Sequence, residues 1–353
     1  MQSCSSKLKV SFLLFGILIL SGFVRNFDLR KQAKENRAQE QKSISSMQGT
    51  VDTKENIQNE EPVHPIRNEP ADYSASNGVK ILFIGDMMFD RHIREAVEKY
   101  GSGDYNYIFK PMKDKLSEYD LVVGNLEGPI TDNKSVSTNT KMDERANLVF
   151  TFDSKVAEVL AENNIKLVNL GNNHILNQGA KGVEETKKYL VEAGVEYFNE
   201  DNFLAREVEG IRLGIVGYNY SVADSEQLAI ENIQKAREQS DIVVVCSHWG
   251  AEYKTGEPGN SVRTLAYRFV DAGADLVIGT HPHVIQNSEE YNGKKIYYSL
   301  GNFVFDQYFS RETMEGLGAE MTIKTDLSME YNELKFEMTK RGQTKLKFPI
   351  PNF

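Results

Sequence analysis

The chain has 353 residues, of which 40% are hydrophobic and 26% charged, so it can bury a core without disulfides or a structural metal. Residues 1–78 hold 10 Lys/Arg and 9 Asp/Glu, whereas the remaining residues hold 31 and 42. This acidic main part argues against sequence-independent binding to nucleic acid, which needs a basic face against the phosphates, and no nucleic acid partner is expected.

An apolar segment stands close to the N-terminus. Residues 10–24 form an uncharged run that follows Lys7 and Lys9. A helix of this length spans about 22 Å, which suits a signal-peptide core or a short membrane span. No small-residue cleavage site and no lipobox cysteine ends the run. We therefore predict an uncleaved signal anchor over residues 1–25, in preference to a cleaved peptide or a buried core helix. Basic residues on both sides leave its orientation open.

Residues 26–78 are polar and are predicted to form a disordered tether. From about residue 30 onward they are rich in Lys, Glu, Gln, Asn and Ser, and Tyr73 is the only aromatic residue. Such a composition cannot bury enough apolar surface to offset the entropy of ordering. A flexible segment of this length has an end-to-end distance of roughly 40 Å. A polar helix over residues 31–45 is the alternative.

The pattern changes at Val79, where a folded domain is predicted over residues 79–353. Short apolar runs lie at residues 79–84, 121–123, 165–170, 211–216, 242–245, 276–278 and 296–300. Segments with helical spacing lie between several of them, at residues 154–163, 183–193, 226–239 and 262–272. This alternation predicts an α/β domain with a largely parallel central sheet. Residues 318–347 alternate apolar and polar residues and predict an antiparallel pair that closes the domain.

The cysteines predict no disulfide framework. Cys4 and Cys246 lie on opposite sides of the apolar N-terminal segment, so an internal bridge is not expected. Cys246 falls inside a predicted buried strand, which favours a core residue over a nucleophile.

Polar side chains follow six of the apolar runs, usually beside a glycine. The candidates are Asp86, Asn125, Glu127, Asn172, Asn173, His174, His248, His281, His283 and Asn302. Taken singly, most of these are ordinary turn residues or packed core histidines. Their joint position at strand ends carries the prediction, because the carboxyl ends of parallel strands meet in one crevice.

The chemistry of this set indicates a metal site. A mixture of imidazole, carboxylate and amide groups suits Zn²⁺, Mn²⁺ or Fe better than the all-oxygen shells of Ca²⁺ and Mg²⁺. The sharpest signal is His281-Pro282-His283, since two imidazoles on one extended turn can reach a single ion. His64, in the tether, and His92 receive no role.

At this point the residues resemble a known family. The motifs are Gly85-Asp86 with Asp90-Arg91, and those at residues 124–127, 172–174, 247–253, 279–284 and 298–307. Together they look like the bacterial capsule-synthesis proteins of the CapA/PgsA family, over about residues 79–308. The resemblance implies a membrane-anchored component of poly-γ-glutamate (capsule) synthesis or export, with a single-pass anchor and an extracellular domain. It implies membrane-bound partners, including an ATP-dependent ligase, because this chain has no G-x-x-x-x-G-K-[ST] loop.

That family is similar in turn to calcineurin-like metallophosphoesterases, which hold two metal ions in an αββα sandwich. The resemblance implies that His174 is catalytic and assists the leaving group. The implied metal ligands are Asp86, Asn173, His248, His281 and His283, with Glu127 as the nearest carboxylate to the bridging position. Asn125, Asn172 and Asn302 are expected to line the site.

Three positions depart from these patterns. Met88 stands where the phosphoesterases have a histidine, and Asn125 stands where they have the bridging aspartate. Asn177 replaces an aspartate usual in the capsule family. These departures favour one divalent ion over two.

The mechanism stays open between catalysis and binding. Two ions would support a metal-dependent hydrolase of a phosphoester or of the polymer, with His174 as general acid and a carboxylate behind it. A single ion would grip carboxylates of an anionic polymer such as poly-γ-glutamate. In that case the domain is a non-catalytic polymer-binding scaffold.

Overall fold

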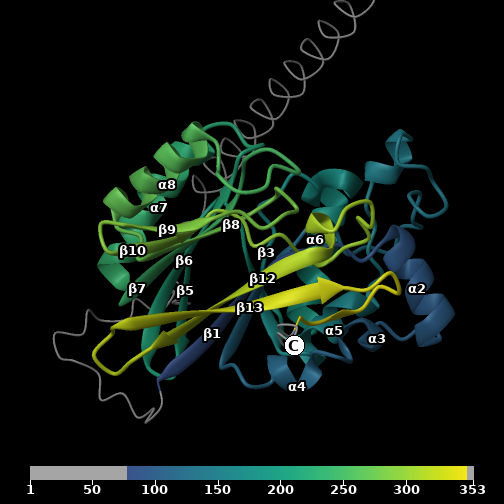
Figure 1. Ribbon diagram of the computed structural model, residues 1–353, viewed down its shortest axis with the longest axis horizontal. Coiled ribbons are helices and arrows are strands. Elements are labelled where there is room, and N and C mark those ends of the chain that lie inside the picture. The colour runs from purple at the N-terminus through teal and green to yellow at the C-terminus, as the bar shows by residue number, and fades with distance from the viewer. Residues whose placement is uncertain (1–77, 348–353) are drawn as a thin grey trace, which may run out of the picture. The chain divides into compact units, whose positions relative to one another are not determined.

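The computed structural model describes residues 78–347, and Figure 1 draws their helices and strands. The predicted anchor (1–25) and, except for its last residue, the predicted tether (26–78) lie outside the described residues. Among the helices of residues 78–347, none is long and apolar enough to cross a membrane.

Eight strands form the first sheet, in the order β14-β13-β12-β1-β2-β3-β4, with β11 paired to β1. The strands that run parallel to one another are β1 (Val79–Met87), β2 (Leu121–Leu126), β3 (Ile165–Asn169), β4 (Glu196–Phe198) and β11 (Asn302–Val304). The antiparallel side consists of β12 (Glu315–Ile323), β13 (Met329–Met338) and β14 (Thr344–Leu346). The antiparallel pair predicted over residues 318–347 is confirmed, with β14 as a third strand.

Six strands form the second sheet, in the order β5-β6-β7-β8-β10-β9. Its parallel strands are β6 (Ile211–Asn219), β7 (Ile242–His248), β8 (Leu276–Thr280) and β10 (Lys294–Tyr297). The antiparallel edges are β5 (Leu204–Val208) and β9 (Ser288–Tyr291).

The α/β class is confirmed, and two sheets are present, as in the αββα sandwich that the family resemblance implies. The largely parallel central sheet predicted from periodicity is instead divided between them. The first three apolar runs belong to the first sheet and the last four to the second. A strand buried on both faces is a short apolar run in either arrangement, so its composition does not reveal which sheet it joins. The last run also differs, because β10 ends at Tyr297 and residues 298–300 lead towards β11.

The two sheets pack face to face, and helices cover their outer faces. Along β1, Ile81 and Phe83 belong to the core between the sheets, whereas Leu82 and Ile84 belong to the core beneath the helices. Successive side chains of a strand point to opposite faces, so one strand serves both cores. The arrangement is therefore four layers: helices, sheet, sheet, helices.

The helices fall into two groups (Figure 1). The first sheet carries α2 (Arg91–Gly101), α3 (Asn106–Phe109), α4 (Lys113–Leu116), α5 (Lys155–Glu162) and α6 (Gly179–Glu192). The second sheet carries α7 (Ser225–Gln239) and α8 (Asn260–Ala272). Single turns of 3₁₀ helix lie at η1 (Arg145–Leu148), η2 (Ile175–Gln178) and η3 (Glu312–Met314). The four helices predicted from spacing are confirmed as α5, α6, α7 and α8.

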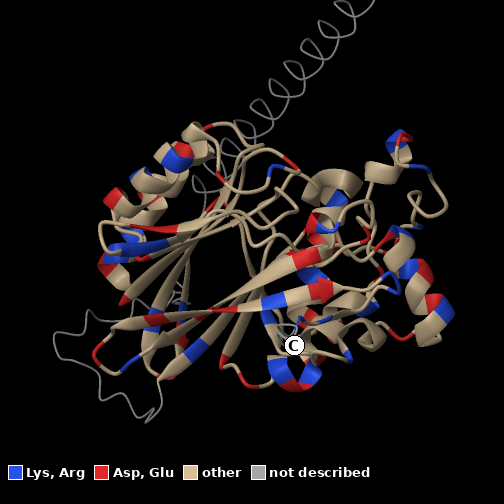
Figure 2. Cartoon of the chain, in the orientation of Figure 1, with Lys and Arg blue, Asp and Glu red and all other residues tan. Residues whose placement is uncertain are grey.

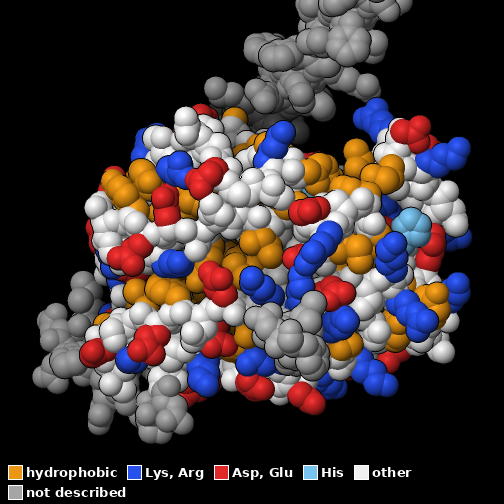
Figure 3. All heavy atoms as spheres, viewed as in Figure 1, with side chains coloured by type: hydrophobic (Ala, Val, Ile, Leu, Met, Phe, Trp, Pro, Cys, Tyr) orange, Lys and Arg blue, Asp and Glu red, His pale blue; other side chains and the backbone are white. Residues whose placement is uncertain are grey.

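Charged side chains lie on the helices and the outer strands, and the central strands β2, β7 and β8 carry none (Figure 2). On the face shown in Figure 3, Lys and Arg appear beside Asp and Glu, with hydrophobic side chains between them. Apart from a few buried residues such as Asp86 and Glu127, the charged side chains thus lie on the solvent side.

Candidate metal centre

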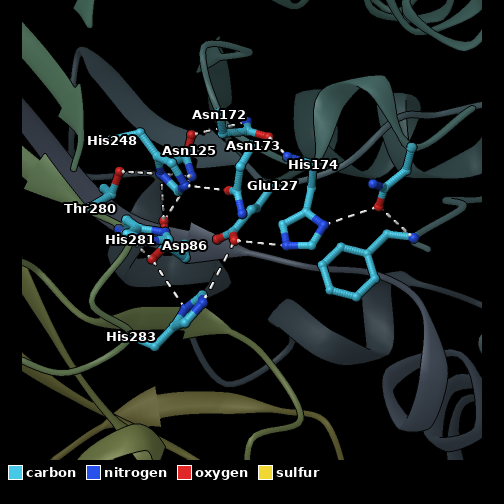
Figure 4. A network of polar contacts seen from close by, with 12 residues as sticks. Asp86, Asn125, Glu127, Asn172, Asn173, His174, His248, Thr280, His281 and His283 are labelled. Carbon is cyan, nitrogen blue, oxygen red and sulfur yellow. Dashed lines mark hydrogen bonds and ion pairs between the residues drawn. The ribbon is translucent and has the colours of Figure 1, made fainter. Parts of the chain in front are cut away.

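The strands of both sheets deliver polar side chains to one place, shown in Figure 4. Asp86 lies near the end of β1, Glu127 follows β2, and the pair Asn173 and His174 follows β3. From the second sheet, His248 ends β7, and the His281-Pro282-His283 turn follows β8. The cluster lies where the carboxyl ends of strands from the two sheets meet, so neither sheet holds the site alone.

Asp86 joins the two sheets at the centre of this cluster. Its Oδ1 accepts a hydrogen bond from Asn125 Nδ2 at 2.7 Å, and its Oδ2 accepts one from the His281 N–H at 3.0 Å. His283 Nδ1 lies 3.4 Å from Oδ2. Burial alone would raise the pKa of Asp86, but the contact and charge of His283, with His248 and Asn125, lower this pKa to about 2. Asp86 is therefore a carboxylate at neutral pH.

Glu127 is buried with no hydrogen bond to either carboxylate oxygen. Its Oε1 lies 3.7 Å from His283 Nε2 and 3.8 Å from His174 Nε2. Burial, followed by the charges of Asp86 and Glu252, raises the pKa of Glu127 well above its ordinary value. A buried carboxyl with no partner costs free energy, so this position needs a compensating group.

Asn302 fixes the proton on His283. The Asn302 amide nitrogen faces three oxygens, those of the His283 and Thr313 carbonyls and Gln307 Oε1. Its Oδ1 is therefore the atom that lies 3.0 Å from His283 Nδ1, and it accepts the proton of that nitrogen. In the neutral ring Nε2 then carries the lone pair on the side of Glu127, which is the tautomer a metal ligand needs.

His248 is buried and held from both sides. Its Nδ1 lies 3.0 Å from Thr280 Oγ1 and 3.3 Å from Asn125 Nδ2, and its Nε2 lies 2.8 Å from Asn173 Oδ1. Thr280 Oγ1 in turn donates to the Ser247 carbonyl oxygen at 3.1 Å. Burial lowers the pKa of His248 well below its ordinary value, against the opposing charge of Asp86. The ring is thus neutral and can act as a ligand.

The His281-Pro282-His283 turn has an uncommon backbone. His281 has φ of 95° and His283 has φ of 57°, conformations that cost side-chain-bearing residues about 1–3 kcal/mol each. Gly279 just before the turn is required by packing, since a Cβ there would lie 2.0 Å from the Tyr298 carbonyl oxygen. His281 Nδ1 is buried without a hydrogen bond, and burial lowers the pKa of His281 to about 4.

A divalent cation fits the residues present. Glu127, His248 and His281 offer ligand atoms within 4.8 Å of one another, and so do Asp86, Glu127 and His283. Glu127 belongs to both groups. The unpaired oxygens of Glu127, the unpaired His281 Nδ1 and the lone pair of His283 Nε2 lie in the same buried cluster, where a cation would relieve their mutual repulsion.

His174 differs from its predicted setting. The prediction places a carboxylate behind it, but the residue 3.0 Å from His174 Nδ1 is Asn177, through Oδ1. That oxygen also accepts the Phe150 N–H at 2.7 Å, and the Phe150 ring stacks on the imidazole with centroids 4.2 Å apart. Burial lowers the pKa of His174 to about 4, which a neutral amide cannot reverse. His174 Nε2, on the Glu127 side, is therefore unprotonated at neutral pH.

The remaining predicted residues brace the cluster or lie behind it. Asn172 donates to the Leu126 carbonyl oxygen at 2.8 Å and accepts the His174 N–H at 3.1 Å. Asn125 Nδ2 donates to Asp86 and lies 3.3 Å from His248 Nδ1, so it positions these two side chains. Met88 faces the core beneath the helices, with its sulfur accepting the Asp90 N–H, and supplies nothing to the site.

Sequence reasoning missed two contributors. Thr280 lies against His248, and Gln307 contacts Asn302 and also donates to the Tyr253 hydroxyl at 3.1 Å. Both belong to the motifs that contain the predicted histidines and Asn302, so their position in the chain could have predicted that they lie near the site.

The described residues thus define a class: a two-sheet α/β domain with a buried His/Asp/Glu cluster that can hold metal ions. Residues 80–307 match the family described as bacterial capsule synthesis protein PGA_cap. The chain belongs to this family, and the resemblance inferred from the motifs is confirmed.

Individual relatives agree with this assignment. The chain is 32% identical over 282 residues to the capsule biosynthesis protein CapA of Bacillus anthracis, covering 72% of this chain and 65% of the relative. It is 34% identical over 252 residues to the PGA biosynthesis protein CapA of Bacillus subtilis (strain 168), covering 65% of this chain and 64% of the relative. The aligned part therefore spans slightly less than two thirds of each relative's length.

A solved phosphatase of Mycoplasma pneumoniae superposes with a TM-score of 0.46 and 15% identity, over 75% of this chain and 96% of the phosphatase.

Proposed function

We propose that the protein is a membrane-anchored component of poly-γ-glutamate capsule synthesis or export, and that its extracellular domain works as a metal-binding domain. The observation that carries the proposal is the buried cluster around Glu127, whose carboxylate oxygens have no hydrogen-bond partner and would be stabilised by a cation. This cluster lies in a domain of the PGA_cap family. The printed names of the Bacillus relatives assign them to capsule and PGA biosynthesis.

In this proposal Asp86, Glu127, His248, His281 and His283 hold the ion, with Asn173 beside His248. Glu127 belongs to both ligand groups, which favours two neighbouring positions for Mn, Zn or Fe over the single ion expected from the motif departures. A divalent ion there would supply a Lewis acid and a counter-charge for anionic oxygens. The four-layer arrangement is of metallophosphoesterase type in this proposal.

In this proposal the anchor over residues 1–25 crosses the cell membrane once and holds the domain on its extracellular side, and the tether separates the domain from the membrane surface. The partners are the anionic polymer, the membrane and membrane-bound synthesis proteins, among them an ATP-dependent ligase. The ligase must be another chain because this sequence has no nucleotide-binding loop of the P-loop type.

One observation favours hydrolysis of a phosphoester or of the polymer as the mechanism. His174 Nε2 lies 3.8 Å from Glu127 Oε1, beside the ligand groups. An imidazole in this position can exchange a proton with a bound substrate. Another observation favours a non-catalytic scaffold: Asn177 gives His174 no carboxylate to hold a proton on the ring.

The test uses the full-length chain with Asp86→Ala, His281→Ala and, as a matched control, Asp114→Ala, which replaces an exposed residue of α4. The wild-type chain and the control should contain one or two divalent ions by elemental analysis. The two ligand variants should lose metal affinity by at least about tenfold. In cells that depend on this chain for polymer, they should also lower cell-surface poly-γ-glutamate.

Absence of metal from the wild-type chain, or full polymer output from both ligand variants, would contradict the proposal. Metal-dependent cleavage of a phosphodiester or of the polymer, lost in both variants, would select the hydrolase. Metal binding with no cleavage would select the scaffold.

A further inference from the structure

Exposed aromatic rings border the metal-ligand histidines. Tyr220 is 43% exposed, Tyr253 44% and Phe309 48%, although large aromatic side chains are usually well covered. We call these three residues the aromatic rim. Their exposure beside a buried polar cluster is the arrangement of a ligand site, where apolar surfaces surround a few polar groups.

The rim and the histidines form one continuous row of rings. The Tyr220 ring lies 4.6 Å from that of His281, and the rings of His281 and His283 are 6.0 Å apart. The Tyr253 ring lies 6.0 Å from that of His283, and Phe309 packs edge-on against Tyr253 at 5.2 Å. A chain-like ligand held at the metal would run along this row.

The backbone holds both tyrosines against the strands that carry the ligands. The Tyr220 N–H donates to the His248 carbonyl oxygen at 3.1 Å, and the Tyr253 N–H donates to the Pro282 carbonyl oxygen at 2.8 Å. Tyr253 has φ of 61°, a strained conformation for a side-chain-bearing residue. Such strain is typical of positions that function fixes, and a rigid aromatic group binds with little loss of entropy.

Hydrogen bonds also connect Tyr253 to the metal ligand beneath it. His283 Nδ1 donates to Asn302 Oδ1, and Asn302 Nδ2 donates to Gln307 Oε1 at 3.1 Å. Gln307 Nε2 then donates to the Tyr253 hydroxyl. The orientation of the rim is therefore set together with that of His283.

The charges beside the rim select which part of a polymer it contacts. Glu252, next to Tyr253, is exposed, and its charge bears on Glu127 and both tyrosines. The Arg91 guanidinium is paired with Asp306 and packed against Phe150 and Phe305, so it is not available to a polyanion. A ligand carboxylate at the buried cluster would thus be attracted by the bound metal, and the apolar rings of the rim would face the uncharged part of the ligand.

From this geometry we infer that the rim binds the amide and methylene backbone of a γ-linked glutamyl chain while the metal centre binds one of its carboxylates; this rests on the proposed function. Flat amides and CH₂ groups pack well on aromatic faces, and each ring contributes about fivefold to tenfold in affinity. The site should therefore prefer a γ-glutamyl oligomer to free glutamate.

The experiment measures binding of a γ-linked glutamate oligomer and of free glutamate to the metal-loaded full-length chain. Tyr220→Ala should weaken oligomer binding about fivefold to tenfold and leave metal content and glutamate binding unchanged, and Tyr253→Ala should weaken oligomer binding by a similar factor. Tyr220→Phe keeps the ring and should bind as wild type. Tyr100→Ala is the matched control, because Tyr100 is 42% exposed on α2 and stacks on Tyr107 outside the site.

Asp86→Ala separates this inference from the proposed function, since it removes the metal and should weaken both ligands. If the wild-type chain holds metal and binds the oligomer, but the tyrosine variants bind equally well, the inference alone is wrong. If the oligomer does not bind to the wild-type chain, the inference is also wrong. Tyrosine-dependent oligomer binding without any metal would support the rim and contradict the metal-centred function.

Discussion

Glu127 is the residue on which the electrostatics of the site depend. Its Oε1 lies 3.7 Å from His283 Nε2 and 3.8 Å from His174 Nε2, and burial with the charges of Asp86 and Glu252 raises its pKa. In the neutral rings both of these nitrogens are acceptors, because Asn302 Oδ1 and Asn177 Oδ1 accept the protons of the opposite nitrogens. Ionised Glu127 is therefore unfavourable in the buried cluster without a cation, and a bound cation would stabilise it.

The substitution Glu127→Gln should therefore have opposite effects with and without metal. In a chelator, the amide donates towards the two imidazoles and replaces a carboxyl that is costly to ionise in its buried position, so the variant should be as stable as wild type or more stable by about 1 kcal/mol. With metal at 100 times its dissociation constant, wild type should gain about 2.7 kcal/mol and the variant little. Thermal unfolding under both conditions measures this.

Glu207→Gln provides the control, because Glu207 is an exposed residue of β5. It should follow wild type in both conditions. A metal-induced stabilisation of Glu127→Gln equal to that of wild type would show that Glu127 is not a ligand.

At the scale of elements, a buried ion pair joins the start of α2 to the segment after β11. Arg91 pairs with Asp306, and Asp306 Oδ2 also accepts the His92 N–H at 3.1 Å. Burial would raise the pKa of Asp306, but His92 and Arg91 together lower it below its ordinary value. The Arg91 side chain packs on Phe150 and Phe305, which line the site beside His174 and His283.

The pH dependence of this pair has a definite sign. A carboxyl whose pKa is lower in the folded state contributes stability that is complete above its unfolded pKa of about 4 and is lost as pH falls through the folded value. Asp306→Asn should cost about 3 kcal/mol at pH 7, and its difference from wild type should shrink below pH 4. Denaturant unfolding between pH 7 and pH 3 tests this, with the exposed Asp114→Asn as control. A difference that stays constant over that range would contradict it.

The elements were predictable to different degrees. Strands such as β2 and β8 are short apolar runs that end in glycine and polar residues, so local composition was sufficient to find them. The division into two sheets depends on which buried strands pair, and equally apolar runs give no sign of it. At the site, the ligand-type residues followed from their positions after strands. The aromatic rim did not, because Tyr220 and Phe309 show their role only through the rings they pack against.

At the scale of the whole domain, the site depends on the two sheets staying together, since each contributes part of it. Cys246 lies in the core between them, as predicted, and burial raises the pKa of its thiol to about 12. It is a buried free cysteine among the described residues. Its reactivity therefore reports on separation of the sheets without involving the metal centre directly.

In a Cys4→Ser chain, whose substitution lies outside the described residues, a thiol reagent should label Cys246 only when the sheets separate. Such opening destroys the site, so metal binding must suppress it. Labelling should slow by about 100-fold at a metal concentration 100 times the dissociation constant. Asp86→Ala should abolish this slowing. The contrary outcome is an equal labelling rate with and without metal in the Cys4→Ser chain, although metal binding is measured. It would mean that the core opens locally while the site stays intact. The two sheets would then not hold the ion jointly.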